Sequence, residues 1–202
     1  MTKRYNIKKF RRINQGYTII ETMIAVSLFI IIIMMGMNAL LNANVLHKKS
    51  QSMRSIIDNL SFIMEDMGRN MRTGINYHCV VGGIFTDLTT PKSCISGGGI
   101  AFKNSIDGST WVYKIETQNG GTTYNIYRSI DGGTTWVQLN PPEVLINSIS
   151  GFSVFGAEPP SAIPPDYLQP FITIRLVGKI TTQNVTTPFS LQTSVSERVI
   201  DI

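Results

Sequence analysis

Residues that carry enzyme chemistry are scarce in this chain of 202 residues. It has two histidines, His47 and His78, and no serine, histidine and aspartate set can be assembled around either of them. The glycine triplet at 97–99 lacks the lysine and the helix start that a phosphate-binding loop needs. Glu65 and Asp66 are the only paired carboxylates, and adjacent residues do not share a helix face. The sequence therefore predicts neither an enzyme nor a cofactor.

Cysteine is equally scarce, with Cys79 and Cys94 as the only two. Two thiols beside one adjacent histidine, His78, lack the four-ligand spacing of a tetrahedral metal site. An exported chain meets an oxidising compartment in many organisms. There the two cysteines would close a loop of about 15 residues and stabilise the fold by roughly 3 kcal/mol. We favour this disulfide over the alternatives, which are free thiols and a metal site that includes His78.

Acidic residues are absent from residues 1–16, which carry six lysines and arginines. The formal charge of the whole chain is +5, but residues 17–202 hold 12 basic and 13 acidic residues, a net charge of −1. After the leader, basic residues cluster only at Lys48 and Lys49, beside His47. Strong binding to nucleic acid needs larger clusters than this. The basic balance therefore indicates membrane topology and argues against a nucleic-acid partner.

One long apolar run, residues 17–41, follows this basic leader directly. As a helix it would be about 37 Å long, enough to cross a hydrocarbon core of ~30 Å. A secretory signal is cleaved after its apolar region, whereas the only small residue suited to cleavage here, Gly16, lies before it. Because basic residues stay in the cytoplasm, we expect the leader inside and the rest of the chain outside.

Glu21 is the one carboxylate within the apolar run. A carboxylate in a membrane is costly, so its presence indicates a function and a partner. The alternative is an ordinary acidic residue near a helix start, where the helix dipole favours negative charge.

Together, the basic leader, Gly16, the aromatic Tyr17 and the carboxylate of Glu21 resemble the class III signal of type IV prepilins and pseudopilins. In that family prepilin peptidase cleaves after the glycine and methylates the new amino terminus; Phe is usual where this chain has Tyr17. The resemblance implies that Glu21 pairs with the freed amine at Tyr17 of a neighbouring subunit and sets the axial register of a filament. It also implies four partners: other pilin or pseudopilin subunits, prepilin peptidase, the inner-membrane assembly platform and, before assembly, membrane lipid.

Beyond the membrane run, apolar residues recur at spacings of three and four, which predicts an amphipathic helix that stops at Gly74. Nothing between Leu41 and Met53 breaks it, so we expect one helix from about Thr18 to Thr73. Its apolar stripe, which should pack on a head domain, consists of Met53, Ile56, Ile57, Leu60, Ile63, Met64, Met67 and Met71.

From Ile100 the apolar period changes to two, with Asp-Gly and Asn-Gly turns between the runs, which predicts an antiparallel meander. The alternating positions, including two tryptophans expected in the core, are Ile100, Phe102, Trp111, Tyr113, Ile115, Tyr124, Ile126, Trp136, Val144 and Ile146. Asp107 and Asp131 fall in the turns, and no second carboxylate stands at calcium-loop spacing beside them. Residues 151–155, 171–180 and 189–195 are further strands, with a polar connection at 181–188.

Two segments are expected to be irregular. Residues 75–99 are rich in glycine, threonine and serine, and residues 158–170 contain five prolines. The predicted fold class is therefore α+β of the type IV pilin-like kind, a long helix packed on an antiparallel meander. The predicted parts are a leader (1–16), a transmembrane or filament-core helix (17–41), an amphipathic helix (42–74) and a β-rich head (75–202).

Residues 59–72 and 190–198 also resemble, more weakly, the J pseudopilin of type II secretion and the PilW-type minor pilins. These resemblances imply a minor pilin or pseudopilin that primes assembly or sits at the filament tip. A competence pseudopilin, a tip adhesin and a plain single-pass anchored domain are the alternatives. We expect a single-pass protein of the cytoplasmic membrane, with its amino terminus in the cytoplasm and its head outside. It would then enter a filament on the cell surface or in the periplasm.

Overall fold

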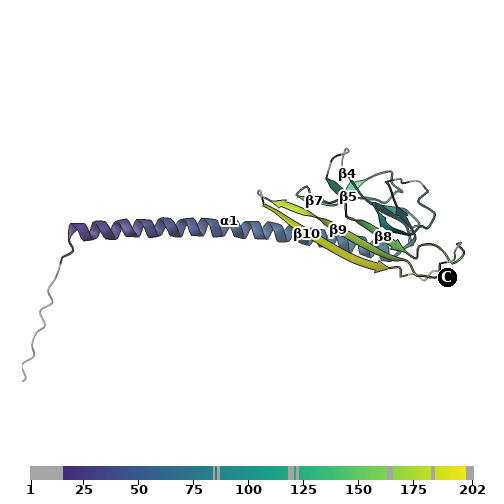
Figure 1. Ribbon diagram of the computed structural model, residues 1–202, viewed down its shortest axis with the longest axis horizontal. Helices are drawn as coiled ribbons and strands as arrows, with labels where there is room; N and C mark the ends of the chain where they lie inside the picture. Colours follow the sequence, from purple (N-terminus) through teal and green to yellow (C-terminus); the bar gives the residue numbers. More distant parts are fainter. Residues whose placement is uncertain are drawn as a thin grey trace, which may run out of the picture. The chain divides into compact units, whose positions relative to one another are not determined.

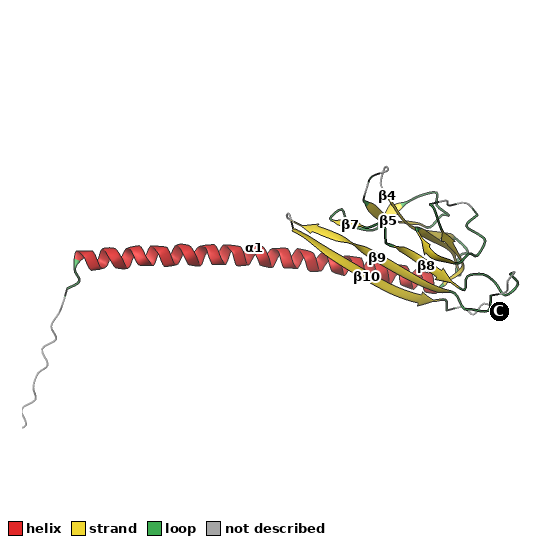
Figure 2. Cartoon of the chain, in the orientation of Figure 1, coloured by secondary structure: helices red, strands yellow, loops and turns green. Residues whose placement is uncertain are grey.

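The computed structural model describes residues 16–83, 85, 87–117, 121, 123–162, 166–182 and 185–198. One helix, α1 (Ile19–Arg72), is followed in this part of the chain by ten strands (Figures 1 and 2). The α+β class and the continuous helix are therefore confirmed. The chain divides into two compact units, Met1–Lys48 and Lys49–Ile202, and α1 contributes to both.

All ten strands belong to one sheet. They are β1 (Gly74–Val80), β2 (Cys94–Gly97), β3 (Gly99–Asn104), β4 (Thr110–Thr117), β5 (Tyr124–Ser129), β6 (Val137–Gln138), β7 (Val144–Ile146), β8 (Gly151–Phe155), β9 (Phe171–Thr182) and β10 (Val185–Ser196). The order is β1-β3-β4-β5-β7-β9-β8-β2, with β10 on β9 and β6 on β5. β3, β4 and β5 pair in sequence order, which confirms the predicted meander there, and β5 with β6 and β8, β9 and β10 also pair in sequence order. A single meander over residues 100–146 is wrong, because β7 pairs with β5 and β9 and not with β6. The reason is the length of β9, which pairs with both β7 and β8 along one edge and with β10 along the other.

The loop expected over residues 75–99 is wrong in part, because β1 and β2 lie within it. Tyr77, Cys79 and Val80 of β1 are buried, and this burial overrides the glycine and serine content that follows. Lys92, two residues before β2, donates its N–H to the Tyr77 carbonyl and accepts one from the Cys79 N–H, each at 2.9 Å. These bonds connect β1, at one end of the strand order, to the segment just before β2, at the other end.

Side chains of α1 and of the sheet form a single core in the second unit. Of the eight predicted stripe residues, five are buried, Met53 and Ile63 pack against the core, and Ile57 is 39% exposed. Beside the stripe, Asn70 Nδ2 donates to the Tyr113 hydroxyl at 3.1 Å, and burial raises the pKa of that tyrosine. The predicted packing of the stripe on the sheet is confirmed.

Glu65 and Asp66, the adjacent acids of α1, pair in different directions. Glu65 pairs with Arg69 one turn along the exposed side of the helix, and Asp66 pairs with Arg128 of β5, each at 3.3 Å. The two carboxylates therefore do not form one site.

Most of the predicted alternating positions in the strands are buried, and Trp111 and Tyr124 pack against the core. The core position predicted for Trp136 is wrong. Its ring centroid lies 4.0 Å from Nζ of Lys114, which stands between the buried Tyr113 and Ile115 and so points to the opposite face of the sheet. Trp136 belongs to the turn before the two-residue strand β6, where strand alternation does not set side-chain direction.

The connection between the last two strands is shorter than predicted. β9 extends to Thr182 and β10 begins at Val185, so both run into the segment 181–188 that was expected to be a polar connection. The described residues of 158–170 contain no strand, which agrees with the predicted irregular loop. The leader residues 1–15, and residues 118–120 of the turn predicted at 118–121, lie outside the described residues.

Candidate functional site

The start of α1 brings together the three residues implicated by the prepilin resemblance. Gly16 and Tyr17 precede the helix, and Tyr17 is 81% exposed. Thr18 caps the helix, since its Oγ1 accepts the Glu21 N–H at 3.4 Å. Thr18 and Glu21 stand three residues apart, the spacing of a capping box. A capped first turn therefore gives a local reason for an acid at position 21, because the positive end of the helix dipole lies there.

Beyond the capped turn, α1 presents apolar side chains on all sides. Within the described residues this is one helix near the amino terminus that is long and apolar enough to cross a membrane, with a mean hydropathy of 2.5 in its most apolar window. None of that window is buried within the chain. The hydroxyls of Thr22 and Ser27 donate to the carbonyls of Ile19 and Ile24 at 2.8 and 2.9 Å, so they satisfy themselves within the helix. This is consistent with a single-pass membrane protein.

Glu21 is the only charged residue from Tyr17 to Leu46. Its carboxylate is exposed, and within the described residues it makes no ion pair or side-chain hydrogen bond. A charge in apolar surroundings is stabilised by a partner or by reaching the polar interface. The helix dipole offsets part of the charge on Glu21, but no described side chain pairs with it.

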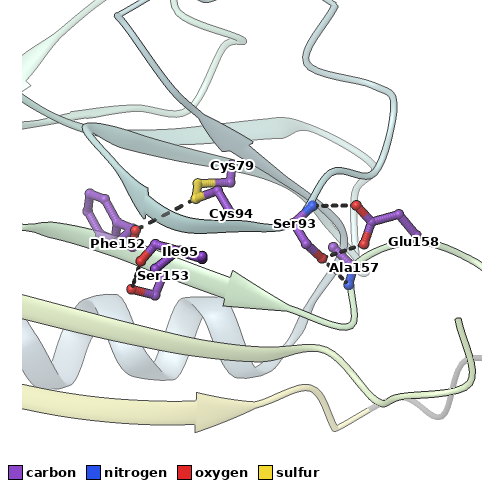
Figure 3. Close-up of a disulfide and its surroundings, with 8 residues drawn as sticks. All are labelled: Cys79, Ser93, Cys94, Ile95, Phe152, Ser153, Ala157 and Glu158. Atoms are coloured by element: carbon purple, nitrogen blue, oxygen red, sulfur yellow. Dashed lines mark hydrogen bonds between the residues drawn. A yellow bond between two sulfur atoms is a disulfide. The ribbon is translucent and has the colours of Figure 1, made fainter.

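The two cysteines, Cys79 on β1 and Cys94 on β2, form a disulfide with a Cα–Cα distance of 5.8 Å (Figure 3). The predicted disulfide is therefore confirmed, and the free-thiol and metal alternatives are wrong. His78 has a different role, because its Nδ1 lies 2.6 Å from the Thr90 carbonyl oxygen. Gly97 lies so close to the bridge that a Cβ there would overlap Cys79 Sγ and stand 2.8 Å from the Val80 carbonyl oxygen.

Glu158 ties the proline-rich loop to the residue beside the disulfide (Figure 3). Its carboxylate accepts the Ser93 N–H at 2.7 Å and the Ser93 hydroxyl, and that hydroxyl in turn accepts the Ala157 N–H at 3.0 Å. Burial alone would raise the pKa of Glu158, but the hydrogen bonds from Ser93 outweigh it and hold the pKa below its ordinary value. No local sequence pattern predicts this contact, because its partners are 65 residues apart.

The other perturbed carboxylates belong to turns. Hydrogen bonds from Ser129, Thr135 and Thr134 hold the pKa of Asp131 well below its ordinary value, and bonds from Ser109 lower that of Asp107. Across the described residues, no three histidine, cysteine or acidic side chains come together as a metal site. The carboxylates with lowered pKa values thus organise loops, and the candidate functional features are the apolar helix, Glu21 and the surfaces of the head.

No family model, curated protein or solved structure matches this chain.

Proposed function

We propose that this chain is a minor pilin or pseudopilin, a non-catalytic subunit of a type IV pilus or type II secretion-like filament that primes assembly or sits at the filament tip. The proposal rests mainly on α1. Its first part is apolar on all sides and carries a single charge, Glu21, in its first turn. Its last part belongs to the core of a disulfide-bonded head.

Processing is the first step of the proposed role. Gly16 and Tyr17 precede the helix, with Tyr17 exposed, so the bond between them is not protected by helical hydrogen bonds. Prepilin peptidase would cleave this bond, remove the basic leader and methylate the new amine of Tyr17. The apolar helix remains as the membrane anchor, with the head outside the cytoplasmic membrane.

Assembly is the second step. The charge on Glu21 costs about 2.5–3.5 kcal/mol at a membrane centre and less near the interface. The freed amine of Tyr17 on a neighbouring subunit carries the opposite charge, and pairing offsets this cost only in the filament. The pair would therefore favour one axial offset between adjacent helices.

The mass of the membrane-extracted protein tests the processing step. In cells with active prepilin peptidase, the mass should correspond to residues 17–202 with one added methyl group, and Gly16→Leu should give the full-length mass. A full-length wild-type protein in those cells would contradict the proposal.

Glu21→Val tests the assembly step. The variant should insert in the membrane as well as wild type does, because a costly charge has been removed. It should be lost from sheared filaments because the amine has no counter-charge. Glu21→Asp, which keeps the charge, should retain part of the incorporation and serves as the matched control.

A plain anchored domain that never assembles is the second candidate, favoured by the helix cap. If Glu21 only complements the helix dipole at Thr18, then Glu21→Val and Glu21→Asp should both leave cellular behaviour unchanged. Cysteine cross-linking between apolar helices in intact membranes would then find no neighbouring copy.

A further inference from the structure

Strand β10 forms a free edge of the sheet, and its register shows which backbone groups face outward. Val185 pairs with Thr182, and two residues separate them. In a hairpin closed in this way the pair that flanks the loop is hydrogen-bonded, and such pairs recur at every second residue. The odd-numbered residues of β10 therefore bond to β9. The even-numbered residues, from Thr186 to Ser196, direct their N–H and C=O groups away from the sheet.

Neighbouring contacts agree with this assignment. The Glu197 N–H donates to Pro170 beside β9 at 3.1 Å, whereas the Arg198 N–H points the other way and donates to the Arg72 carbonyl at 3.0 Å. Pro188, which has no N–H, occupies an outward position, as expected of proline on an edge strand. The open edge therefore runs between Pro188 and Arg198. Four outward N–H groups without a partner among the described residues lie on it, those of Ser190, Gln192, Ser194 and Ser196.

This edge lacks the usual protection against pairing. Natural edge strands are short or carry charged side chains, bulges or prolines, and the one proline of β10, Pro188, lies before the segment from Ser190 to Ser196. β10 has 12 residues, no charged residue and one proline. Its pairing with β9 is continuous from Val185 to Ser196 without a bulge. The segment from Ser190 to Ser196 is thus long enough to pair with a strand of ordinary length.

A groove of about 400 Å³ lies between this edge and α1. Met64, Gly68 and Val195 are buried along it, and a Cβ at Gly68 would stand 3.3 Å from Val195 Cγ2. The groove is also lined by Glu65, Arg69, Arg72 and Arg198, which together carry a net charge of +2. Glu65 neutralises Arg69, so the excess charge is that of Arg72 and Arg198, which form no ion pair within the described residues. The positive end of the groove is therefore the end at which β10 finishes.

We propose that the outer edge of β10 binds an extended segment of another protein, which adds an antiparallel strand and begins with acidic residues. The unpaired N–H and C=O groups supply the ladder, as in other cases of strand addition to a sheet edge. In an antiparallel pair the first residues of the added strand lie beside the last residues of β10, where Arg72 and Arg198 provide the complementary charge. This site lies in the head and goes beyond the proposed filament role, because it needs neither processing nor assembly.

A synthetic peptide tests the proposal with the full chain in detergent micelles. The probe has nine residues, two aspartates followed by alternating threonine and valine, and carries a fluorophore. Binding should raise its anisotropy and should protect the amides of Ser190, Gln192, Ser194 and Ser196 from hydrogen exchange. A peptide with the aspartates moved to its carboxyl end should bind more weakly, and equal binding would overturn the antiparallel arrangement.

N-methylation of the peptide separates a backbone ladder from non-specific adsorption. Two peptides are compared, one methylated on the odd-numbered amides and the other on the even-numbered amides. One of them should lose binding and the other should bind nearly as well as the unmethylated peptide, since only one set of amides faces β10. Equal affinities of the two methylated peptides would overturn the proposed ladder of backbone hydrogen bonds. Protection of the same four amides without peptide, rising with protein concentration, would show that a second copy occupies the edge and would also overturn the proposal.

Two substitutions complete the test. Gln192→Pro removes one outward N–H and no bond to β9, and should weaken binding about tenfold. Arg198→Gln should weaken binding about three- to fivefold at low salt, whereas Arg175→Gln, on the exposed face of β9, should have no effect. Peptide affinity that is unchanged in a folded Gln192→Pro chain would contradict the proposed site.

Discussion

The two parts of α1 differ in how much apolar side chain they carry and in how it is arranged around the helix. Leu28, in the first part, is 55% exposed and has apolar neighbours on every side of the helix, whereas Leu60, in the second, is fully buried. Around Leu60 the apolar residues form one stripe, and charged residues such as Asp58 occupy the rest of the surface. The distribution of polar residues therefore decides which part of the helix packs on a sheet and which part needs lipid or other helices.

The same difference decides what stabilises each part. Burial of a leucine side chain contributes about 1.5–3 kcal/mol, so the stripe of α1 is a large share of the head's core. The first part gains nothing comparable from its own chain, and its exposed apolar surface far exceeds what a soluble monomer carries. Lipid, or neighbouring helices in a filament, would provide that burial.

The largest effect is expected from Leu60→Asp. The substitution removes a fully buried side chain and places a carboxylate in the core, which should cost about 4 kcal/mol or more. Because a domain of this size is stabilised by only about 5–15 kcal/mol, the head should unfold or melt far below wild type. Thermal melts followed by near-UV circular dichroism in detergent would measure this.

Asp58→Ala is the control for Leu60→Asp, since Asp58 lies two residues away on the exposed side of α1. It should melt within a degree or two of wild type, because an exposed substitution changes stability by about 0.5 kcal/mol or less. Equal melting of both variants would show that α1 does not stabilise the head.

The same substitution in the first part, Leu28→Asp, should give the opposite pattern. The melting temperature of the head should not change, because Leu28 contacts none of its core. Membrane insertion should become less favourable by about 3 kcal/mol. Carbonate extraction of membranes would measure the loss, and Leu28→Ala is the control. A shift in the melting temperature of the head in Leu28→Asp would show that the first part of α1 contributes to the stability of the head.

Much of the fold was predictable from local sequence patterns. The helix stripe, the β3-β4-β5 meander and the proline-rich loop follow from periodicity and turn residues. The pairings between non-consecutive strands, such as β7 with β9 and β2 with β8, were not predictable, since they depend on partners that no local pattern identifies. The strand β1 was missed because burial of Tyr77 and Cys79 outweighs the composition of the glycine-rich segment that follows.

The residues of the candidate site also fall into two groups, those that a local sequence pattern indicates and those that depend on distant contacts. Gly16, Tyr17 and Glu21 were singled out as candidates because a contiguous motif carries them, and the disulfide was predicted because only two cysteines exist. Glu158 and the edge of β10 were not found. The first depends on a contact with Ser93, and the second on which groups β9 leaves unpaired, and neither has a signature in local sequence.

Gly97→Ala should disturb the head from strand β2. The added Cβ would overlap the disulfide, and we expect a loss of about 1–3 kcal/mol. Hydrogen exchange should increase in residues 49–72 of α1, which share the core, and not in residues 19–48. Gly98→Ala is the matched control, because its Cβ would meet nothing closer than 3.7 Å. Comparable effects of the two alanines would show that the close approach at Gly97 is not needed.

The smallest effect is expected from Glu158→Gln, and it depends on pH. The pKa of Glu158 is lower in the folded chain than in the unfolded one, because its bonds to Ser93 outweigh the effect of burial. Such a group stabilises the fold above its unfolded pKa, and this contribution is lost as the pH falls through the folded pKa. Since the carboxylate is only partly buried, we expect the variant to be less stable than wild type by about 1 kcal/mol at neutral pH.

That difference should shrink as the pH falls from about 6 to about 3, because wild-type Glu158 then becomes neutral like glutamine. Asp107 and Asp131 also lose stabilising charge in acid, but they do so equally in both chains and cancel in the comparison. Glu143→Gln, at an exposed carboxylate without a side-chain bond among the described residues, is the control and should be about as stable as wild type at neutral pH. Far-UV circular dichroism in detergent should show the helix of residues 19–48 unaffected throughout. A gap between wild type and Glu158→Gln that persists in acid would mean that the shape of the side chain, and not its charge, holds the proline-rich loop against Ser93.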